Sequence, residues 1–161
     1  MKILVMYHSR TGRTKELAEE VALGARSAAN VNCDVKAAEE VTAEDFISAA
    51  GIIAGSPVYF GSMAAELKAV FDRMLTVRKK MADKIGAAFA TSGFHSGGKE
   101  TTLISIIQAM MIYGMIIVGD PLDATGHYGA ACSGAIDAAT AATARKLGER
   151  VARLATLVHG N

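Results

Sequence analysis

Short apolar runs alternate with stretches of helical period along nearly the whole chain. Four runs are continuous or nearly so, at 2–7, 51–55, 85–90 and 115–118, and a fifth, 33–37, alternates apolar and polar residues. Between and after them, apolar residues recur at helical spacing over about 12–29, 43–50, 63–81, 99–113 and 135–158. This order favours parallel strands joined by helices. We therefore predict one α/β domain over residues 1–161, with a three-layer, doubly wound five-stranded parallel sheet in the order 2-1-3-4-5.

The character of each run predicts its place in the sheet. The alternating run 33–37 is typical of an edge strand, and the continuous run 51–55 is typical of a central strand buried on both faces. Thr42, with Asp45 three residues later, predicts a capped short helix. The segment 120–133, which contains Pro121 and two glycines, is expected to be a long loop.

Charge, cysteines and histidines exclude several classes of function. With 17 basic and 16 acidic residues, the chain gives no electrostatic case for binding nucleic acid or an anionic membrane. Cys33 and Cys132 form no CxxC pair and are expected to be free thiols of a reducing compartment. The histidines show no metal-ligand spacing, so no metal is expected. No apolar run suits a signal peptide or a membrane span, and we expect a cytoplasmic protein.

Three of the expected strands end in turns rich in small and hydroxyl residues, at 9–14, 56–62 and 91–98. In a sheet of the predicted order, ligands bind at the carboxyl ends of the strands, where the first and third strands part. All three turns are expected to meet there. Their convergence predicts a ligand site at this edge of the sheet.

The first of these turns has the chemistry of a phosphate site. Ser9, Thr11 and Thr14 supply hydroxyls, and Gly12 precedes a helix whose free N–H groups attract an anion. Neither a Walker A motif nor a GxGxxG fingerprint is present. An ordinary capped strand-to-helix turn is the alternative. Arg10 and Arg13 either add positive charge or are solvated surface residues.

The three turns together resemble those of flavodoxin-like flavoproteins. The first matches the pattern T/S-x-T-G-x-T of their phosphate loop. The segment 55–63, GSPVYFGSM, resembles the second flavin loop of the NAD(P)H:quinone oxidoreductase, or WrbA-type, branch, and 92–102, SGFHSGGKETT, resembles the third. The segments 113–119, YGMIIVG, and 127–130, HYGA, are similar to later parts of the same branch.

This resemblance implies an FMN-dependent oxidoreductase that passes two electrons from NADH or NADPH to a quinone or similar small acceptor. It also implies a homo-oligomer, either a dimer or a tetramer. His95 and His127 are the candidate catalytic residues, because a histidine above the flavin can donate a proton to a quinone oxygen; a backbone hydrogen bond is the alternative for each. The residues expected to bind FMN are Ser9, Arg10, Thr11, Gly12, Arg13, Thr14, Pro57, Val58, Tyr59, Phe60, Gly61, Thr91, Ser92, Gly93, Phe94, Gly97 and Gly98.

Several alternatives stay open. A flavodoxin-like electron carrier is the second interpretation, although such carriers are expected to be strongly acidic and this chain has a net charge of +1. An FMN-binding module without reductase activity is the third, because the chain lacks tryptophan. Phe60 is either a wall of the site or a core residue. The apolar helix at 103–113 faces either the sheet or another copy of the chain.

Overall fold

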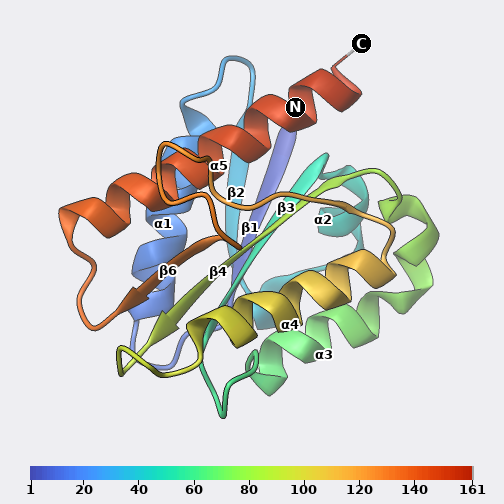
Figure 1. The fold of residues 1–161 in the computed structure, drawn as a ribbon. Helices are drawn as coiled ribbons and strands as arrows, with labels where there is room; N and C mark the ends of the chain where they lie inside the picture. The colour runs from blue at the N-terminus through green and yellow to red at the C-terminus, as the bar shows by residue number, and fades with distance from the viewer. Residues whose placement is uncertain (161) are drawn as a thin grey trace.

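The chain folds as alternating strands and helices in the predicted order (Figure 1). The computed structural model describes residues 1–160, so that Asn161, the last residue of the expected domain, lies outside the described residues. The elements are β1 (Lys2–Tyr7), α1 (Arg13–Arg26), β2 (Asn32–Ala37), the 3₁₀ turn η1 (Ala38–Glu40), α2 (Ala43–Ser48), β3 (Gly51–Pro57), α3 (Ala65–Arg73), the 3₁₀ helix η2 (Met74–Met81), β4 (Ile85–Ser92), α4 (Lys99–Ile112), β5 (Ile116–Ile117), β6 (Ala130–Ser133) and α5 (Ala138–His159).

The sheet is parallel and has the order β2-β1-β3-β4-β5, which confirms the predicted fold class. In β1, Val5 pairs with Val35 of β2 on one side and with Ile53 of β3 on the other. The half-buried strand β2 lies at the edge, as its alternating sequence predicts, and β3 lies in the centre. All the strands therefore place their carboxyl ends at one edge of the sheet.

The fifth position of the sheet differs from the prediction. We expected one strand at 115–118 and a loop over 120–133, but β5 contains only two residues, and β6 lies within the expected loop. β5 pairs with the start of β4, and β6 pairs with its end, Phe89–Ser92. An inserted segment, residues 118–129, thus splits the fifth strand. The sequence AACS has too few residues to show a strand period, and pairing with β4 decides its conformation.

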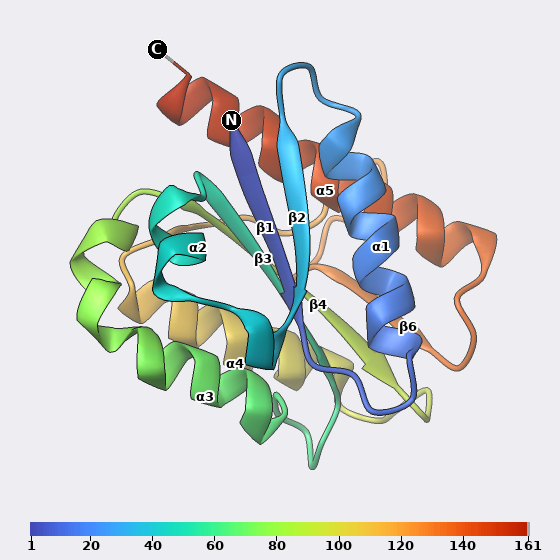
Figure 2. The ribbon, with the colours of Figure 1, turned by 180° about the vertical axis from the view of Figure 1, so that it is seen from behind.

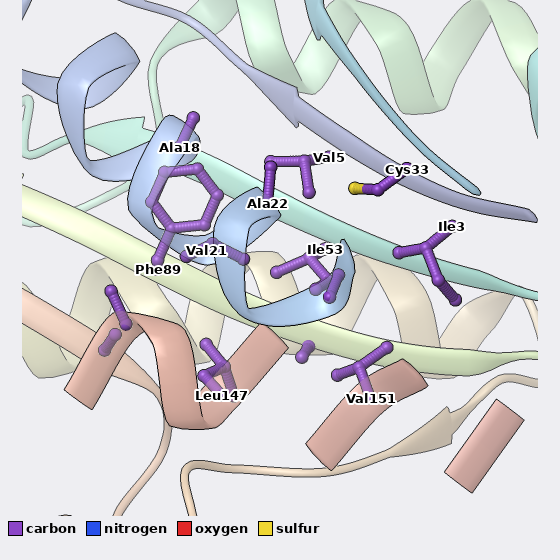
Figure 3. Close-up of a cluster of buried hydrophobic side chains, with 14 of the residues drawn as sticks. Ile3, Val5, Ala18, Val21, Ala22, Cys33, Ile53, Phe89, Leu147 and Val151 are labelled. Carbon is purple, nitrogen blue, oxygen red and sulfur yellow. The ribbon is translucent and has the colours of Figure 1, made fainter. Parts of the chain in front are cut away.

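Apolar cores cover both faces of the sheet. Because successive side chains of a strand point to opposite faces, Ile3 and Val5 face α1 and α5, whereas Leu4 and Met6 face α2, α3 and α4. Figure 3 shows the first of these cores, in which Phe89 of β4 lies near Val21 of α1. Each core lies between the sheet and one layer of helices, so the fold has three layers with the sheet in the middle.

Two glycines allow α1 and α5 to pack closely on one side of the sheet (Figures 1 and 2). A Cβ atom added to Gly24 would lie 1.9 Å from the carbonyl oxygen of Arg145. A Cβ atom added to Gly148 would lie 1.9 Å from the carbonyl oxygen of Val21. Real Cβ atoms do not approach backbone oxygens so closely, so these two helices contact each other directly through their backbones.

The helix predicted over 63–81 is divided in the structure. α3 ends at Arg73, and the next eight residues form η2, which has 3₁₀ geometry. Met74, Val77 and Met81 of η2 remain buried at spacings of three and four residues. Buried residues at this spacing fit an α-helix and a 3₁₀ helix equally well. The sequence pattern therefore wrongly predicted one continuous helix over 63–81.

Charged side chains hold both ends of α2. At its start, Thr42 and Asp45 form the predicted capping box. Burial acts to raise the pKa of Asp45, but hydrogen bonds from Lys36 and Thr42 and the positive charge of Lys36 outweigh burial and lower this pKa to about 2. At the end of the helix, the buried ammonium of Lys84 donates to the carbonyl oxygens of Phe46, Ile47 and Ala49 at 2.6–2.7 Å.

Candidate functional site

The first turn of the site links β1 to α1 and leaves several backbone donors free. The N–H of Gly12, which has a left-handed φ of +90°, donates to the Ser9 hydroxyl at 3.1 Å and closes the turn. The first intrahelical bond runs from the N–H of Glu16 to the carbonyl of Gly12. The N–H groups of Arg13, Thr14 and Lys15 come before Glu16 and have no acceptor within the helix. They point out of its N-terminal end, where an anion is stabilised.

The second turn follows β3 and is a tight two-residue loop. Tyr59 and Ser62 exchange two backbone hydrogen bonds of 3.1 Å, with Phe60 and Gly61 at the tip. Both tip residues have positive φ, +51° and +76°, and left-handed φ disfavours a side chain such as that of Phe60. Phe60 is fully exposed, so the interpretation of Phe60 as a core residue is wrong.

The third turn follows β4 and is held by hydroxyl groups. The hydroxyls of Ser92 and Ser133 both donate to the carbonyl oxygen of Phe94, at 2.8 and 3.1 Å, while the Phe94 ring is exposed. Gly97 and Gly98 let the chain turn back into α4. A Cβ atom on Gly97 would lie 2.0 Å from the Ser92 hydroxyl, and one on Gly98 would lie 3.0 Å from the Cα of Gly61. The second and third turns are therefore in contact.

The three turns surround one cavity of about 290 Å³, as the sequence predicts. A hydrogen bond of 2.8 Å joins the hydroxyls of Thr14 and Thr91, which are only 2% and 4% exposed, so the first and third turns meet at the floor. The guanidinium of Arg10 lies 6.0 Å from the centre of the Tyr59 ring and connects the first and second turns. The lining residues are Arg10, Thr11, Arg13, Thr14, Pro57, Val58, Tyr59, Thr91, Ser92 and Gly93.

The lining of this cavity favours an anion. Its two charged residues, Arg10 and Arg13, are both basic, and Thr11, Thr14, Thr91 and Ser92 add hydroxyl donors. Pro57 and Val58 add apolar surface beside them. A phosphate attached to a partly apolar group matches this combination of donors and walls.

The other expected site residues lie outside this lining. Ser9 and Gly12 shape the first turn, Phe60 and Gly61 form the tip of the second, and Phe94, Gly97 and Gly98 belong to the third. His95 is exposed in the third turn. His127 lies on the inserted segment and lines a different cavity, so the structure does not place the two candidate catalytic histidines in one cavity.

His8, to which the sequence assigned no role, lies directly behind the second turn. Among the residues that the structure describes, its buried Nε2 atom has no hydrogen-bond partner, and the Glu66 carboxylate lies 3.7 Å away. The His8 ring also meets the Tyr59 ring edge-on, with 6.3 Å between the centroids. His8 therefore supports the Tyr59 wall, and its position one residue after β1 was the only signal of this in the sequence.

A second cavity, of about 360 Å³, lies between the first turns of α4 and α5. His127 and Tyr128 form one wall, and Leu103, Gly129 and Ala131 add apolar surface. The charged residues at this cavity are Lys99, Glu100 and Asp137, so its charges are mixed, in contrast to those of the first cavity.

Residues 1–160 contain neither a membrane-spanning helix nor a cluster of metal-ligating side chains. Within residues 1–160, every helix is too short or too polar to cross a bilayer. No cluster of three or more histidine, cysteine or acidic side chains in the same range is placed to hold a metal ion. Cys33 and Cys132 are both buried and unpaired, as the sequence predicts.

Comparison with known proteins gives the family. Residues 29–130 match the NADPH-dependent FMN reductase family. The chain is 37% identical to a flavodoxin of Aquifex aeolicus, over 94% of this chain and 85% of that protein. It is 32% identical to an NAD(P)H dehydrogenase (quinone) of Archaeoglobus fulgidus, over 96% of this chain and 97% of that protein.

A solved structure agrees with these relatives. The WrbA-like flavodoxin protein of Agrobacterium tumefaciens superimposes with a TM-score of 0.83 and 25% identity, over 98% of each chain. The resemblance that we inferred from the three turns is thereby confirmed. The chain belongs to the NADPH-dependent FMN reductase family and has the flavodoxin-like fold.

Proposed function

We propose that the protein is an FMN-dependent oxidoreductase that transfers two electrons from NADPH or NADH to a quinone or similar small acceptor. One observation carries this proposal: three strand ends surround a single cavity whose charged lining residues are both arginines. The family match and the quinone dehydrogenase relative support the same chemistry. When bound, FMN would supply the redox chemistry, because the lining of the cavity contains no cysteine or other side chain that accepts a hydride.

The residues present fit FMN. The free N–H groups at the start of α1, the hydroxyls of Thr11 and Thr14, and the guanidinium groups of Arg10 and Arg13 would hold its phosphate. Open space lies around Gly93, where an added Cβ atom would meet nothing within 4 Å. The third turn can therefore approach a ligand closely.

The second turn would hold the flat ring of the cofactor. Pro57 restricts the backbone at the end of β3, and Val58 and Tyr59 form an apolar wall that keeps water away. Thr91 and Ser92 would donate hydrogen bonds to polar atoms of the ring. Phe60, Gly61, Phe94, Gly97 and Gly98 would complete the rim of the site, and His95 or His127 would deliver a proton to the reduced acceptor.

A reductive titration tests the proposal directly. The protein loaded with FMN is mixed anaerobically with NADPH or NADH, and the visible flavin absorbance is followed before and after a quinone is added. We expect rapid bleaching by a nicotinamide and recovery on addition of the quinone. A protein that stays colourless when titrated with FMN would refute cofactor binding, and a flavin bleached by neither nicotinamide would refute the reductase.

An electron carrier is the second candidate, because the flavodoxin of Aquifex aeolicus is 37% identical to this chain. A carrier would exchange electrons with a redox protein and would react with neither NADH nor NADPH. The net charge of +1 argues against this role, since carriers are expected to present a strongly acidic docking face. The same titration separates the two functions.

We also propose that residues 1–161 form one domain, that the chain assembles with itself, and that it works in the cytoplasm. Leu75, Met111 and Ile112 are exposed near a groove of about 360 Å³ between α3 and α4, where a second copy would cover them. Light scattering of the purified protein should give at least twice the mass of 16.8 kDa. Ile112→Lys should lower that mass, and a wild-type monomer would refute the assembly.

The two unpaired thiols support the proposed location in the cytoplasm, because free thiols persist in a reducing compartment.

A further inference from the structure

His8 contacts the chain before, within and after the second turn. Its backbone N–H donates to the carbonyl oxygen of Gly55 at 3.1 Å, and its ring meets the ring of Tyr59 edge-on. Glu66 lies in the first turn of α3, just after the second turn, and its Oε1 atom is 3.7 Å from the Nε2 atom of His8. One imidazole therefore lies between the end of β1, the second turn and α3.

The Nε2 atom of His8 is the unsatisfied group in this arrangement. It is buried and, among the residues that the structure describes, has no hydrogen-bond partner. A buried polar nitrogen without a partner costs free energy. The 3.7 Å distance to the Glu66 carboxylate is only slightly longer than a hydrogen bond, and the Glu66 side chain is 53% exposed. A small movement of this exposed side chain would therefore give Nε2 its partner.

The protonation state of the imidazole decides how strong this contact is. A carboxylate only accepts hydrogen bonds, so His8 must donate from Nε2. Neutral imidazole carries its single N–H on one of its two nitrogens, whereas imidazolium carries an N–H on both and adds an attractive charge. The contact between His8 and Glu66 is therefore strongest when His8 is protonated.

Other charged groups face His8 from the neighbouring elements. Glu39 and Glu40 belong to η1, which packs against α3, and both are negative, like Glu66. On the cavity side, the guanidinium of Arg10 lies over the ring that His8 contacts. Among the described residues, Glu66 is the acidic group placed to pair with Nε2, so a change at Glu66 tests this contact.

We propose that His8 is a positioning residue for the flavin ring: paired as an imidazolium with Glu66, it holds the Tyr59 wall of the cavity in place, so that binding of the ring takes up a proton. The inference rests on the proposed binding of FMN in this cavity. Tyr59 lines the cavity, and a flat ring that packs on it binds more tightly when the wall is already fixed. Protonation and ring binding both favour the fixed wall, so by linkage each favours the other.

Riboflavin is the probe for this coupling, because FMN carries a phosphate that itself titrates near about pH 6. Its affinity is measured between about pH 5 and 8, the range in which a histidine changes its charge. We expect the wild-type protein to bind riboflavin roughly three- to fivefold more tightly at the acid end, which is the effect of a partly exposed ion pair. Calorimetry in two buffers of different ionisation enthalpy should show that binding takes up protons.

Two variants and two controls assign the proton. Glu66→Gln removes the charge and His8→Gln removes the titrating ring, so the affinity of each for riboflavin should change less than about 1.5-fold across the pH range. Glu149→Gln and His159→Gln make the same exchanges at exposed positions of α5, and both should keep the wild-type pH dependence. Because Glu66 is exposed, Glu66→Gln is expected to fold and carries the test if His8→Gln does not.

Two results would overturn the inference: riboflavin binding that does not depend on pH in the wild type, or a pH dependence that persists in Glu66→Gln. If His8 only filled space, His8→Gln would lose the same affinity at every pH. A wild-type protein that binds neither FMN nor riboflavin would refute the proposed function and the inference together. One that binds both flavins but is reduced by neither nicotinamide would refute the reductase alone, and the pH dependence of binding would still decide the role of His8.

Discussion

Replacing Thr14 with valine removes one hydroxyl from the floor of the cavity where α1 begins. In the structure that hydroxyl forms a 2.8 Å hydrogen bond with Thr91, and both groups are buried. Each hydroxyl has one hydrogen, so one of the pair donates to its partner and the other keeps its hydrogen for a ligand. Valine has nearly the same shape as threonine, which limits the change to this hydrogen-bonding group.

The size of the effect follows from the charge of the phosphate. A hydrogen bond to a charged group contributes about 1.5–3 kcal/mol, which corresponds to an increase of roughly 10- to 150-fold in the dissociation constant of FMN. Riboflavin has the same ring and ribityl chain but no phosphate. Its affinity should therefore change less than about twofold in Thr14→Val. The free energy of unfolding of the empty protein should also fall by about 1–3 kcal/mol, because the Thr91 hydroxyl loses its buried partner.

Titration of each flavin, followed by the quenching of its fluorescence, measures both affinities in the wild type and the variant. Thr76→Val is a matched control, because Thr76 is exposed on η2 and lies outside the lining of the cavity. An equal loss of affinity for FMN and riboflavin would refute the role of Thr14 in phosphate binding. Unchanged affinity for FMN would refute the position of the phosphate at the start of α1.

Three further predictions concern stability and are measured by urea unfolding. Gly148→Ala should cost about 1–3 kcal/mol, because its Cβ would lie 1.9 Å from a backbone oxygen of α1, whereas Gly93→Ala, where nothing lies within 4 Å, should cost less than about 0.5 kcal/mol; equal costs would contradict the close helix packing. Lys84→Met should cost about 1–3 kcal/mol by leaving three carbonyl oxygens without their donor, and the exposed Lys80→Met is its control; similar values for the two would contradict the role of Lys84. The pKa of Asp45 is about 2 in the folded chain, below its ordinary value of 3.8, so this carboxylate should contribute about 2 kcal/mol above pH 4 and lose this contribution as the pH falls towards 2. Asp45→Asn should abolish that part of the pH dependence, and an unchanged profile would contradict it.

The elements that the sequence predicted well are those whose pattern is local. The strands at 2–7 and 51–57 contain the apolar runs 3–7 and 51–55, and the burial of these runs on both faces follows from their composition. The cap at Thr42 is equally local, since its partner Asp45 lies three residues away. The predictions failed where a local pattern fits two structures, as in η2, or where four residues are too few to show a period, as in β6.

In the candidate site, too, some features were predictable from local sequence and others depend on the folded structure. Small and hydroxyl residues at the ends of strands predicted the three turns, because a parallel sheet brings its carboxyl ends together. The contact between Thr14 and Thr91, which are 77 positions apart, depends on how α1 and β4 pack. The approach of Glu66 to the Nε2 atom of His8 likewise required the folded chain, since a histidine after a strand shows no such partner in the sequence.

The sequence by itself determined the α/β class and the anion-binding character of the first turn, because hydrophobic period and turn chemistry are properties of neighbouring residues. The predicted strand order followed from the alternation of strands and helices, which favours a doubly wound sheet. Only the tertiary structure decided which residues line the cavity, that Phe60 is exposed rather than in the core, and that His127 lines a separate cavity. These features depend on contacts between residues far apart in the chain. Such contacts form only when the strands pair and the helices pack, and no local pattern specifies them.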